Sequence, residues 1–324
     1  MIIVTGGAGF IGSAIVWRLN ELGKSNIIIV DDLGTDEKWK NLVPLNFEDF
    51  VHNDEFISMV LDRDLPFELS AVIHMGANSS TTEKDADHLY SNNYLYTKEL
   101  ATFCLEKNVR FIYASSAATY GDGSLGFDDD ENKLETLRPL NMYGYSKQMF
   151  DLWAKRNNVF DKITGLKYFN VYGPNEYHKG DMRSVVHKAF EQIRATGRVK
   201  LFKSPNPKYK DGEQLRDFIY IKDAVDMTLY FLENPRVNGL FNVGTGKART
   251  WNDLVTSIFK AMDIELNIEY IDLPKHLENK YQYFTEANMG KIKKAGFTSS
   301  FTSLEKGVTD YVKNYLLGRG YLGA

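Results

Sequence analysis

The segment YGYSK places Tyr143 four residues before Lys147, and Ser116 lies 27 residues upstream of the tyrosine. Residues i and i+4 share one face of a helix, so the phenol and the ammonium are expected to point the same way. A phenol has a pKa of about 10, and a nearby ammonium favours its charged form. With a serine hydroxyl, the pair suits removal of a proton from an alcohol while hydride leaves the same carbon. Alone, the spacing is equally typical of an ordinary amphipathic helix.

A hydride acceptor is indicated by the first twelve residues, MIIVTGGAGFIG. An apolar run at 2–4 reaches a glycine cluster, and helical spacing follows, which is typical of a dinucleotide-binding βαβ unit. Gly6 and Gly9 would let the backbone approach a pyrophosphate, and Gly12 would let the helix pack close to the sheet. The phosphates would then sit on the positive helix N-terminus.

The second apolar run, residues 26–32, ends in Asp31 and Asp32. Asp31 falls 19 residues after Gly12, where an acid commonly holds the adenosine ribose hydroxyls. An acid at this position favours NAD, because it repels the 2′-phosphate of NADP. Lys38 would offset that repulsion, so the residues alone leave the choice between the two cofactors open.

Strand and helix patterns alternate through the first half of the chain. Apolar runs at 71–75, 110–116 and 163–172 alternate with helical spacing at 84–107 and 139–156, and a short helix is expected within 47–62. This alternation predicts an α/β fold, a Rossmann-like doubly wound parallel sheet with helices on both faces. The small-residue turn 76–80 would carry the cofactor over the strand ends, and His74 is expected to be a packed core histidine.

The regular alternation fails after residue 173. Helices are expected at 183–194, 223–232, 251–262 and 304–316, with short strands at 218–221 and 239–243. We expect a dinucleotide-binding domain at 1–173, to which 218–245 returns. Segments 174–217 and 246–324 are expected to form a smaller, interleaved substrate-binding lobe.

The composition excludes several classes of protein. A net charge of -4 over 324 residues, without a basic run, gives no sign of a nucleic-acid surface. No apolar run approaches the roughly 20 residues of a membrane span, and the chain starts on a core strand instead of a signal peptide. The single cysteine, Cys104, rules out an internal disulfide and is expected to be buried. We expect a cytoplasmic enzyme without a bound metal.

The motifs GGAGFIG, YASSAATYG, YGYSK and YFNVYGP stand in the order of the extended short-chain dehydrogenases/reductases, which the chain resembles over nearly its full length. The segments HMGANSSTTE, LNMYGYSK and EYHKGDM resemble, more narrowly, the ADP-L-glycero-D-manno-heptose 6-epimerases of that superfamily. Of these elements, SSTTE and HKG are the more specific.

This resemblance implies epimerisation at carbon 6 of an ADP-linked heptose used in lipopolysaccharide core synthesis. Bound NADP would take hydride from that carbon, and the resulting ketone would turn and take hydride back on its other face. Two acid/base groups serve such a reaction, and the family assigns them to Tyr143 and to the lysine of HKG, Lys179. The resemblance also implies a homo-oligomer, a pentamer.

The family assigns further contacts residue by residue. Besides the three glycines and Lys179, the cofactor contacts are Phe10, Ile11, Asp31, Asp32, Lys38, Met75, Gly76, Ala77, Asn78, Ser79, Asn92, Lys147 and Val171. The substrate contacts are Ser116, Asn170, Asp181, Lys188, Arg216 and Tyr281. The chain departs from the family at Asn53, usually a lysine, at Asp181, often a serine, and in its long 204–214 loop.

Two alternatives remain beside this interpretation. A UDP-hexose 4-epimerase shares the serine, tyrosine and lysine, and only HKG and SSTTE argue against it. A non-catalytic dinucleotide-binding regulator generally lacks the tyrosine or the lysine, and this chain keeps both. A 4,6-dehydratase needs an acidic pair after the site serine, where this chain has Ala117 and Ala118.

Overall fold

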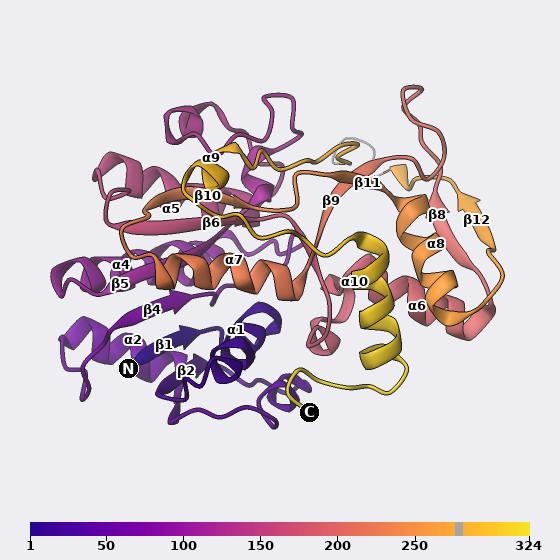
Figure 1. Cartoon of the computed structure of the whole chain (residues 1–324). Helices are drawn as coiled ribbons and strands as arrows, with labels where there is room; N and C mark the ends of the chain where they lie inside the picture. Colours follow the sequence, from indigo (N-terminus) through magenta and orange to yellow (C-terminus); the bar gives the residue numbers. More distant parts are fainter. Residues whose placement is uncertain (276–280) are drawn as a thin grey trace.

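The computed structural model describes residues 1–275 and 281–324. Its central element is a seven-stranded, all-parallel sheet in the order β10-β6-β5-β4-β1-β2-β3 (Figure 1). The strands are β1 Ile2–Thr5, β2 Ile27–Asp31, β3 Asp49–His52, β4 Ala71–His74, β5 Arg110–Ser116, β6 Ile163–Tyr168 and β10 Gly239–Val243. The chain runs outward from β1 to β3 and then returns to β4 on the other side of β1. This reversal makes a switch point, beyond which ligands bind at the strands' carboxyl ends.

Helices cover both faces of the sheet (Figure 1). Neighbouring residues in a strand point to opposite faces, and Ile3 and Val4 accordingly belong to two different core clusters. The first cluster includes side chains of α2 Asn53–Asp62, α4 Tyr96–Glu106 and α5 Met142–Arg156, and the second includes side chains of α1 Phe10–Glu21 and α7 Ile221–Glu233. Cys104 is fully buried in the first cluster, as predicted. The doubly wound α/β prediction is therefore confirmed.

The predicted strand 163–172 is two strands in different sheets. β6 ends at Tyr168, and β7 Asn170–Tyr172 pairs with β9 Leu215–Tyr220, which also pairs with β11 Ala248–Thr250. The predicted strand at 218–221 thus lies in this three-stranded sheet, whereas β10 joins the main sheet. Sequence pattern does not distinguish the sheets, because an apolar run is equally compatible with either. The domain boundaries remain a prediction.

Four strands were missed altogether, and one of them is the three-residue β11. β3 precedes α2 within the segment predicted as a short helix, and it has a single buried residue, Val51, so it lacks an apolar run. β8 Val199–Phe202 and β12 Ile268–Ile271 form a small parallel pair. An edge or two-stranded element buries little surface, which leaves a weak pattern in the sequence.

The remaining helices agree with the predicted ones to within a few residues. They are α3 Ala86–Leu89, which runs through a π-helical stretch into α4, then α6 Val185–Thr196, α8 Trp251–Met262 and α10 Leu304–Asp310. The short helix α9 Gly290–Lys294 was not predicted. Figure 1 shows α6, α8, β8 and β12 together at the end of the molecule away from the main sheet. Across residues 1–275 and 281–324, no helix combines the length and apolarity needed to cross a bilayer.

Candidate active site

The glycine turn after β1 is closely packed against the turn after β4. Gly6 has a φ of 63°, and a Cβ built on it would lie 2.7 Å from the amide nitrogen of Gly76. A Cβ on Gly12 would lie 2.0 Å from the Gly6 carbonyl oxygen. Gly9 caps α1 without a side-chain hydrogen bond, so the first amides of the helix keep their donors for a ligand. This geometry fits a dinucleotide pyrophosphate.

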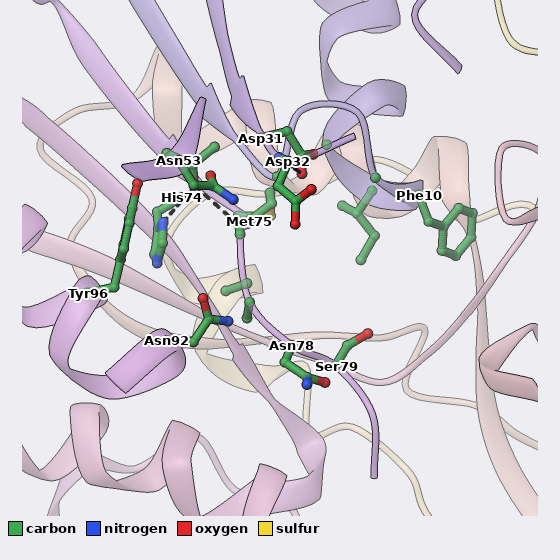
Figure 2. A pocket seen from close by; sticks show the side chains of 18 of the residues that line it. Phe10, Asp31, Asp32, Asn53, His74, Met75, Asn78, Ser79, Asn92 and Tyr96 are labelled. Atoms are coloured by element: carbon green, nitrogen blue, oxygen red, sulfur yellow. Dashed lines mark hydrogen bonds between the residues drawn. The ribbon is translucent and has the colours of Figure 1, made fainter. Parts of the chain in front are cut away.

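A cavity of about 440 Å³ opens at the switch point, beside the carboxyl ends of β1, β2, β4 and β5. Figure 2 shows Asp31 and Asp32 at one side of this cavity and Asn78 and Ser79 across from them. Every residue predicted to contact the cofactor lines the cavity except Val171. The other lining residues are Tyr143, predicted to be catalytic, and Thr5, Asn53, His74, His88, Tyr96, Ala114, Ser115, Tyr168 and His178, which were not predicted to contact the cofactor.

Asp31 is held and neutralised within the protein. Its Oδ1 accepts a hydrogen bond from the Lys38 ammonium at 2.9 Å, and its Oδ2 accepts one from the Ala8 amide at 2.8 Å. Lys38 is therefore placed where it offsets the carboxylate, as predicted from the sequence. Asn53, at the start of α2, lines the same cavity.

The turn after β4 is tied to α5 by Asn93. Asn93 accepts a hydrogen bond from the Asn78 amide at 2.9 Å and donates to the Asn78 carbonyl at 2.9 Å and to Ser146 Oγ at 3.0 Å. His74 is a packed core histidine, as predicted, because its nitrogens contact Thr5 at 2.6 Å and Thr97 at 2.8 Å. Burial lowers its pKa to about 3, so it is neutral.

Tyr143 and Lys147 lie on the first turns of α5, as the spacing predicted, and both line the cavity. Asn141 caps this helix by accepting a hydrogen bond from the Gly144 amide at 2.8 Å. The Lys147 ammonium donates to the Ala114 carbonyl at 2.8 Å. Ser116, at the end of β5, shares a side-chain hydrogen bond with Tyr143. Serine, tyrosine and lysine thus meet at one strand end.

The Tyr143 phenol does not show the lowered pKa that a nearby lysine ammonium was expected to cause. Burial raises the pKa of the Tyr143 phenol, and the hydrogen bond with Ser116 opposes this only in part. Burial also lowers the pKa of Lys147 to about 8, against the attraction of Asp151. The ammonium therefore does not bring the phenol below its ordinary pKa in the protein alone, because desolvation is the larger effect.

Lys179 reaches the same cavity from a different part of the chain. It belongs to the 3₁₀ segment Tyr177–Met182, and its ammonium lies 5.5 Å from the centre of the Phe10 ring. Burial lowers the pKa of Lys179, while the carboxylate of Glu176 opposes the shift. A lysine predicted from the HKG motif alone is thus brought to the cavity that Tyr143 lines.

The predicted substrate residues lie outside this cavity. The Arg216 guanidinium lies between the rings of Trp251 and Tyr281, 5.5 and 5.4 Å from their centres, and donates to the Leu215 carbonyl at 2.8 Å. Tyr281 also accepts a hydrogen bond from Trp251 at 3.1 Å. Trp251 was missed, because its place at the start of a helix gives no sign of a ligand contact. The structure brings Arg216 and Tyr281 together.

The other predicted substrate contacts differ in their exposure. The Lys188 ammonium donates to the backbone carbonyl of Asp181 at 3.1 Å. Asn170 is exposed on β7 and accepts a hydrogen bond from Thr285 at 3.5 Å. Ser116 is buried beside Tyr143 instead of lining the cavity wall. Their roles in substrate binding remain predictions.

Three comparisons bear on this site. Residues 2–244 match the family model described as the NAD dependent epimerase/dehydratase family. The chain is 62% identical, over 316 residues and 98% of both chains, to the ADP-L-glycero-D-manno-heptose-6-epimerase of Nitratidesulfovibrio vulgaris. The crystal structure of the Helicobacter pylori ADP-L-glycero-D-manno-heptose-6-epimerase is similar with a TM-score of 0.80 and 28% identity, covering 97% of this chain and 95% of that one.

The fold by itself is shared more widely. A UDP-N-acetylglucosamine 4-epimerase from Methanobrevibacter ruminantium superposes with a TM-score of 0.82 at 24% identity, covering 98% of both chains. At that identity the likeness shows the fold alone, and the sequence relationship makes the finer assignment. The chain belongs to the NAD dependent epimerase/dehydratase family, and within it to the ADP-L-glycero-D-manno-heptose-6-epimerases.

Proposed function

We propose that the protein interconverts the two 6-epimers of ADP-glycero-manno-heptose, through a 6-keto intermediate, in lipopolysaccharide core precursor synthesis. The observation that carries the proposal is the 62% identity with a relative of that name over 98% of both chains. It is supported by the fact that the glycine turn, Tyr143, Lys147 and Lys179 line one and the same cavity.

The cofactor is a nicotinamide dinucleotide, and such a group bound in the cavity would accept hydride from the sugar carbon and return it. We propose NADP instead of NAD, because Lys38 neutralises Asp31 beside the cavity. The Lys38 ammonium forms an ion pair with that acid and lines the cavity, so it is the proposed partner of a 2′-phosphate. NAD remains the alternative. Asn53 would supply an amide where a second cation is usual in the family.

The chain's own groups handle the protons. Epimerisation needs one group to remove the hydroxyl proton and another to return a proton to the ketone from the opposite side. One of these two groups must therefore be protonated while the other is deprotonated. Burial raises the pKa of Tyr143 and lowers that of Lys179, so their environments favour opposite proton states. We propose that these two groups form the acid/base pair and that Ser116 donates to the substrate oxygen.

A specific feature separates this proposal from a UDP-hexose 4-epimerase, which shares the fold, the serine, the tyrosine and the lysine. Lys179 lines the cavity beside Phe10, and it lies in the HKG motif. The proposed ADP-sugar contacts beyond the cavity are Asn170, Asp181, Lys188, Arg216 and Tyr281. A cytoplasmic location, expected from the composition, and a pentameric homo-oligomer, implied by the family resemblance, are likewise proposed.

Two measurements test the proposal. Purified protein should interconvert the two 6-epimers of ADP-manno-heptose, followed by NMR of the sugar. Absence of interconversion, together with 4-epimerisation of a UDP-hexose, would contradict it. Denaturing the purified protein should release mostly NADP, and release of mainly NAD would reject the proposed role of Lys38.

A further inference from the structure

A buried ion pair lies directly behind the tyrosine and lysine of α5. The side chains of Asp151 and Lys167 are both 0% exposed, and their charged atoms are 2.8 Å apart. Asp151 is on α5, four residues after Lys147, and Lys167 is on β6, paired in register with Ser115 of β5. Burying two charges is costly unless their remaining hydrogen-bond capacity is satisfied. The pair therefore needs a reason beyond stability.

Asp151 accepts hydrogen bonds from the two residues of β5 that flank Ala114, whose carbonyl binds Lys147. One carboxylate oxygen accepts a hydrogen bond from the Tyr113 hydroxyl at 2.8 Å, and the other accepts one from Ser115 Oγ at 2.8 Å. The residue between these two, Ala114, presents the carbonyl that binds the Lys147 ammonium at 2.8 Å. The carboxylate thus anchors the two residues that flank that carbonyl.

The other half of the pair extends the arrangement to the site serine. The Lys167 ammonium donates to Thr119 Oγ1 at 2.5 Å, and Thr119 donates to the Ser116 carbonyl at 2.8 Å. The ammonium also lies 5.0 Å from the centre of the Tyr120 ring. One ion pair thus fixes the backbone on which both Lys147 and Ser116 depend.

We propose that Asp151, paired with Lys167, is a positioning residue that keeps Lys147 charged and fixes the end of β5 for the reaction. This inference rests on the function proposed above. Burial lowers the pKa of Lys147 to about 8, and the charge of Asp151 raises it. Without that carboxylate, Lys147 would lose its proton at a lower pH.

Other charged or titratable groups face this cluster from each packed element. They are His74 of β4, Tyr113 of β5, Tyr120 in the turn after β5, Glu131 in the segment between that turn and α5, Lys167 of β6 and Tyr143 of α5. Lys179 and His88 line the same cavity as Lys147. Burial holds His74 neutral and raises the pKa values of the three tyrosines, so these groups are uncharged at neutral pH. Asp151 is therefore the anion that acts on Lys147 most directly.

The test measures the proton affinity of Lys147 in variants at this pair. The variants are Asp151→Asn, the double variant Asp151→Asn/Lys167→Met, which leaves no unpaired buried charge, and the control Asp129→Asn. Asp129 is also a buried acid of this region, but it accepts a hydrogen bond from the Asn242 amide and does not act on Lys147. Acetic anhydride acetylates only neutral amines, so the rate at each lysine against pH, read by mass spectrometry, gives its pKa.

We expect the midpoint of Lys147 labelling to fall by about one pH unit in Asp151→Asn. The double variant should show a smaller fall and a higher melting temperature than the single variant. The midpoint of Lys179 should stay constant in all variants, and Asp129→Asn should lower only the melting temperature. An unchanged Lys147 midpoint in Asp151→Asn would reduce the pair to a structural role and overturn the inference.

The labelling measurement needs no sugar substrate, so its outcome is independent of the proposed function. With active substrate in hand, the loss of kcat at high pH should move to lower pH in Asp151→Asn by the same interval as the labelling midpoint. A fall in kcat of equal size at every pH would instead indicate damage to the fold, and would contradict the assigned effect on Lys147.

Discussion

Lys147 and Lys179 face one cavity, but the chain holds them in different ways. Lys147 projects from the long helix α5 and donates to a backbone carbonyl of the central sheet at 2.8 Å. Lys179 projects from a 3₁₀ segment that contains Gly180 with a φ of 51°, and its ammonium lies over the Phe10 ring. Within the described residues, the Lys179 ammonium has no hydrogen bond.

Each lysine nevertheless has a buried carboxylate nearby. Asp151 follows Lys147 by one helical turn, and Glu176 precedes Lys179 in the loop and accepts a hydrogen bond from Ser184 Oγ at 2.6 Å. The two lysines therefore differ in whether the ammonium is hydrogen-bonded, and not in whether a carboxylate lies nearby. A fixed ammonium suits a constant partner such as a bound cofactor, whereas an ammonium without hydrogen bonds can meet a substrate that must turn during the reaction.

The largest effect is expected from Lys147→Met. It should lower kcat about 10³-fold and also weaken retention of the dinucleotide, because the lost ammonium serves both. Steady-state kinetic assays measure kcat, and analysis of the nucleotide that co-purifies with the protein measures retention of the dinucleotide. Full retention of the dinucleotide would show that Lys147 acts only on the substrate and would remove the distinction drawn above.

Lys179→Met should lower kcat about 10²-fold and leave the dinucleotide bound. The exposed Lys260 of α8 supplies a matched control, since Lys260→Met removes the same charge far from the cavity wall. The same assays apply. Wild-type kcat in Lys179→Met would exclude this lysine from the acid/base pair.

Glu176→Gln should have the smallest effect, a few-fold change in kcat. The Glu176 charge raises the pKa of Lys179, so its removal lowers that pKa, and the neutral amine becomes available at lower pH. The pH–rate limb that depends on neutral Lys179 should move to lower pH, while the limb assigned to Lys147 stays in place. Movement of both limbs would show that the two lysines are electrostatically coupled.

Glu176→Gln also has a consequence for stability. Burial raises the pKa of Glu176 above its unfolded value, so in the window between the two values the native state binds more protons than the unfolded state. Stability from this group is therefore lost as pH rises through that window. Thermal unfolding measured from pH 4.5, the ordinary pKa of a glutamate, upward should show this slope in the wild type and a flatter curve in the variant.

Much of the fold could be predicted because parallel strands buried on both faces leave strong apolar runs. β2, with every residue buried, is such a run, and it was found. β3 has one buried residue, so the apolar pattern did not reveal it. β7 continues the apolar run of β6 after a break at Phe169, so the two strands were predicted as one. The pairing partner of a strand depends on residues far away in the sequence, so the local apolar pattern does not predict it.

The sequence by itself determined the local chemistry of this protein: the glycine turn, the acid and lysine after β2, and the helical spacing of Tyr143 and Lys147. These depend on backbone sterics and on contacts between residues close in the chain. The tertiary structure alone decided that Lys179 meets Tyr143 in one cavity, and that burial moves their pKa values in opposite directions. It also placed Asp151 against Lys167 and Asn93 against Asn78. Desolvation and long-range contacts arise only when distant segments pack together.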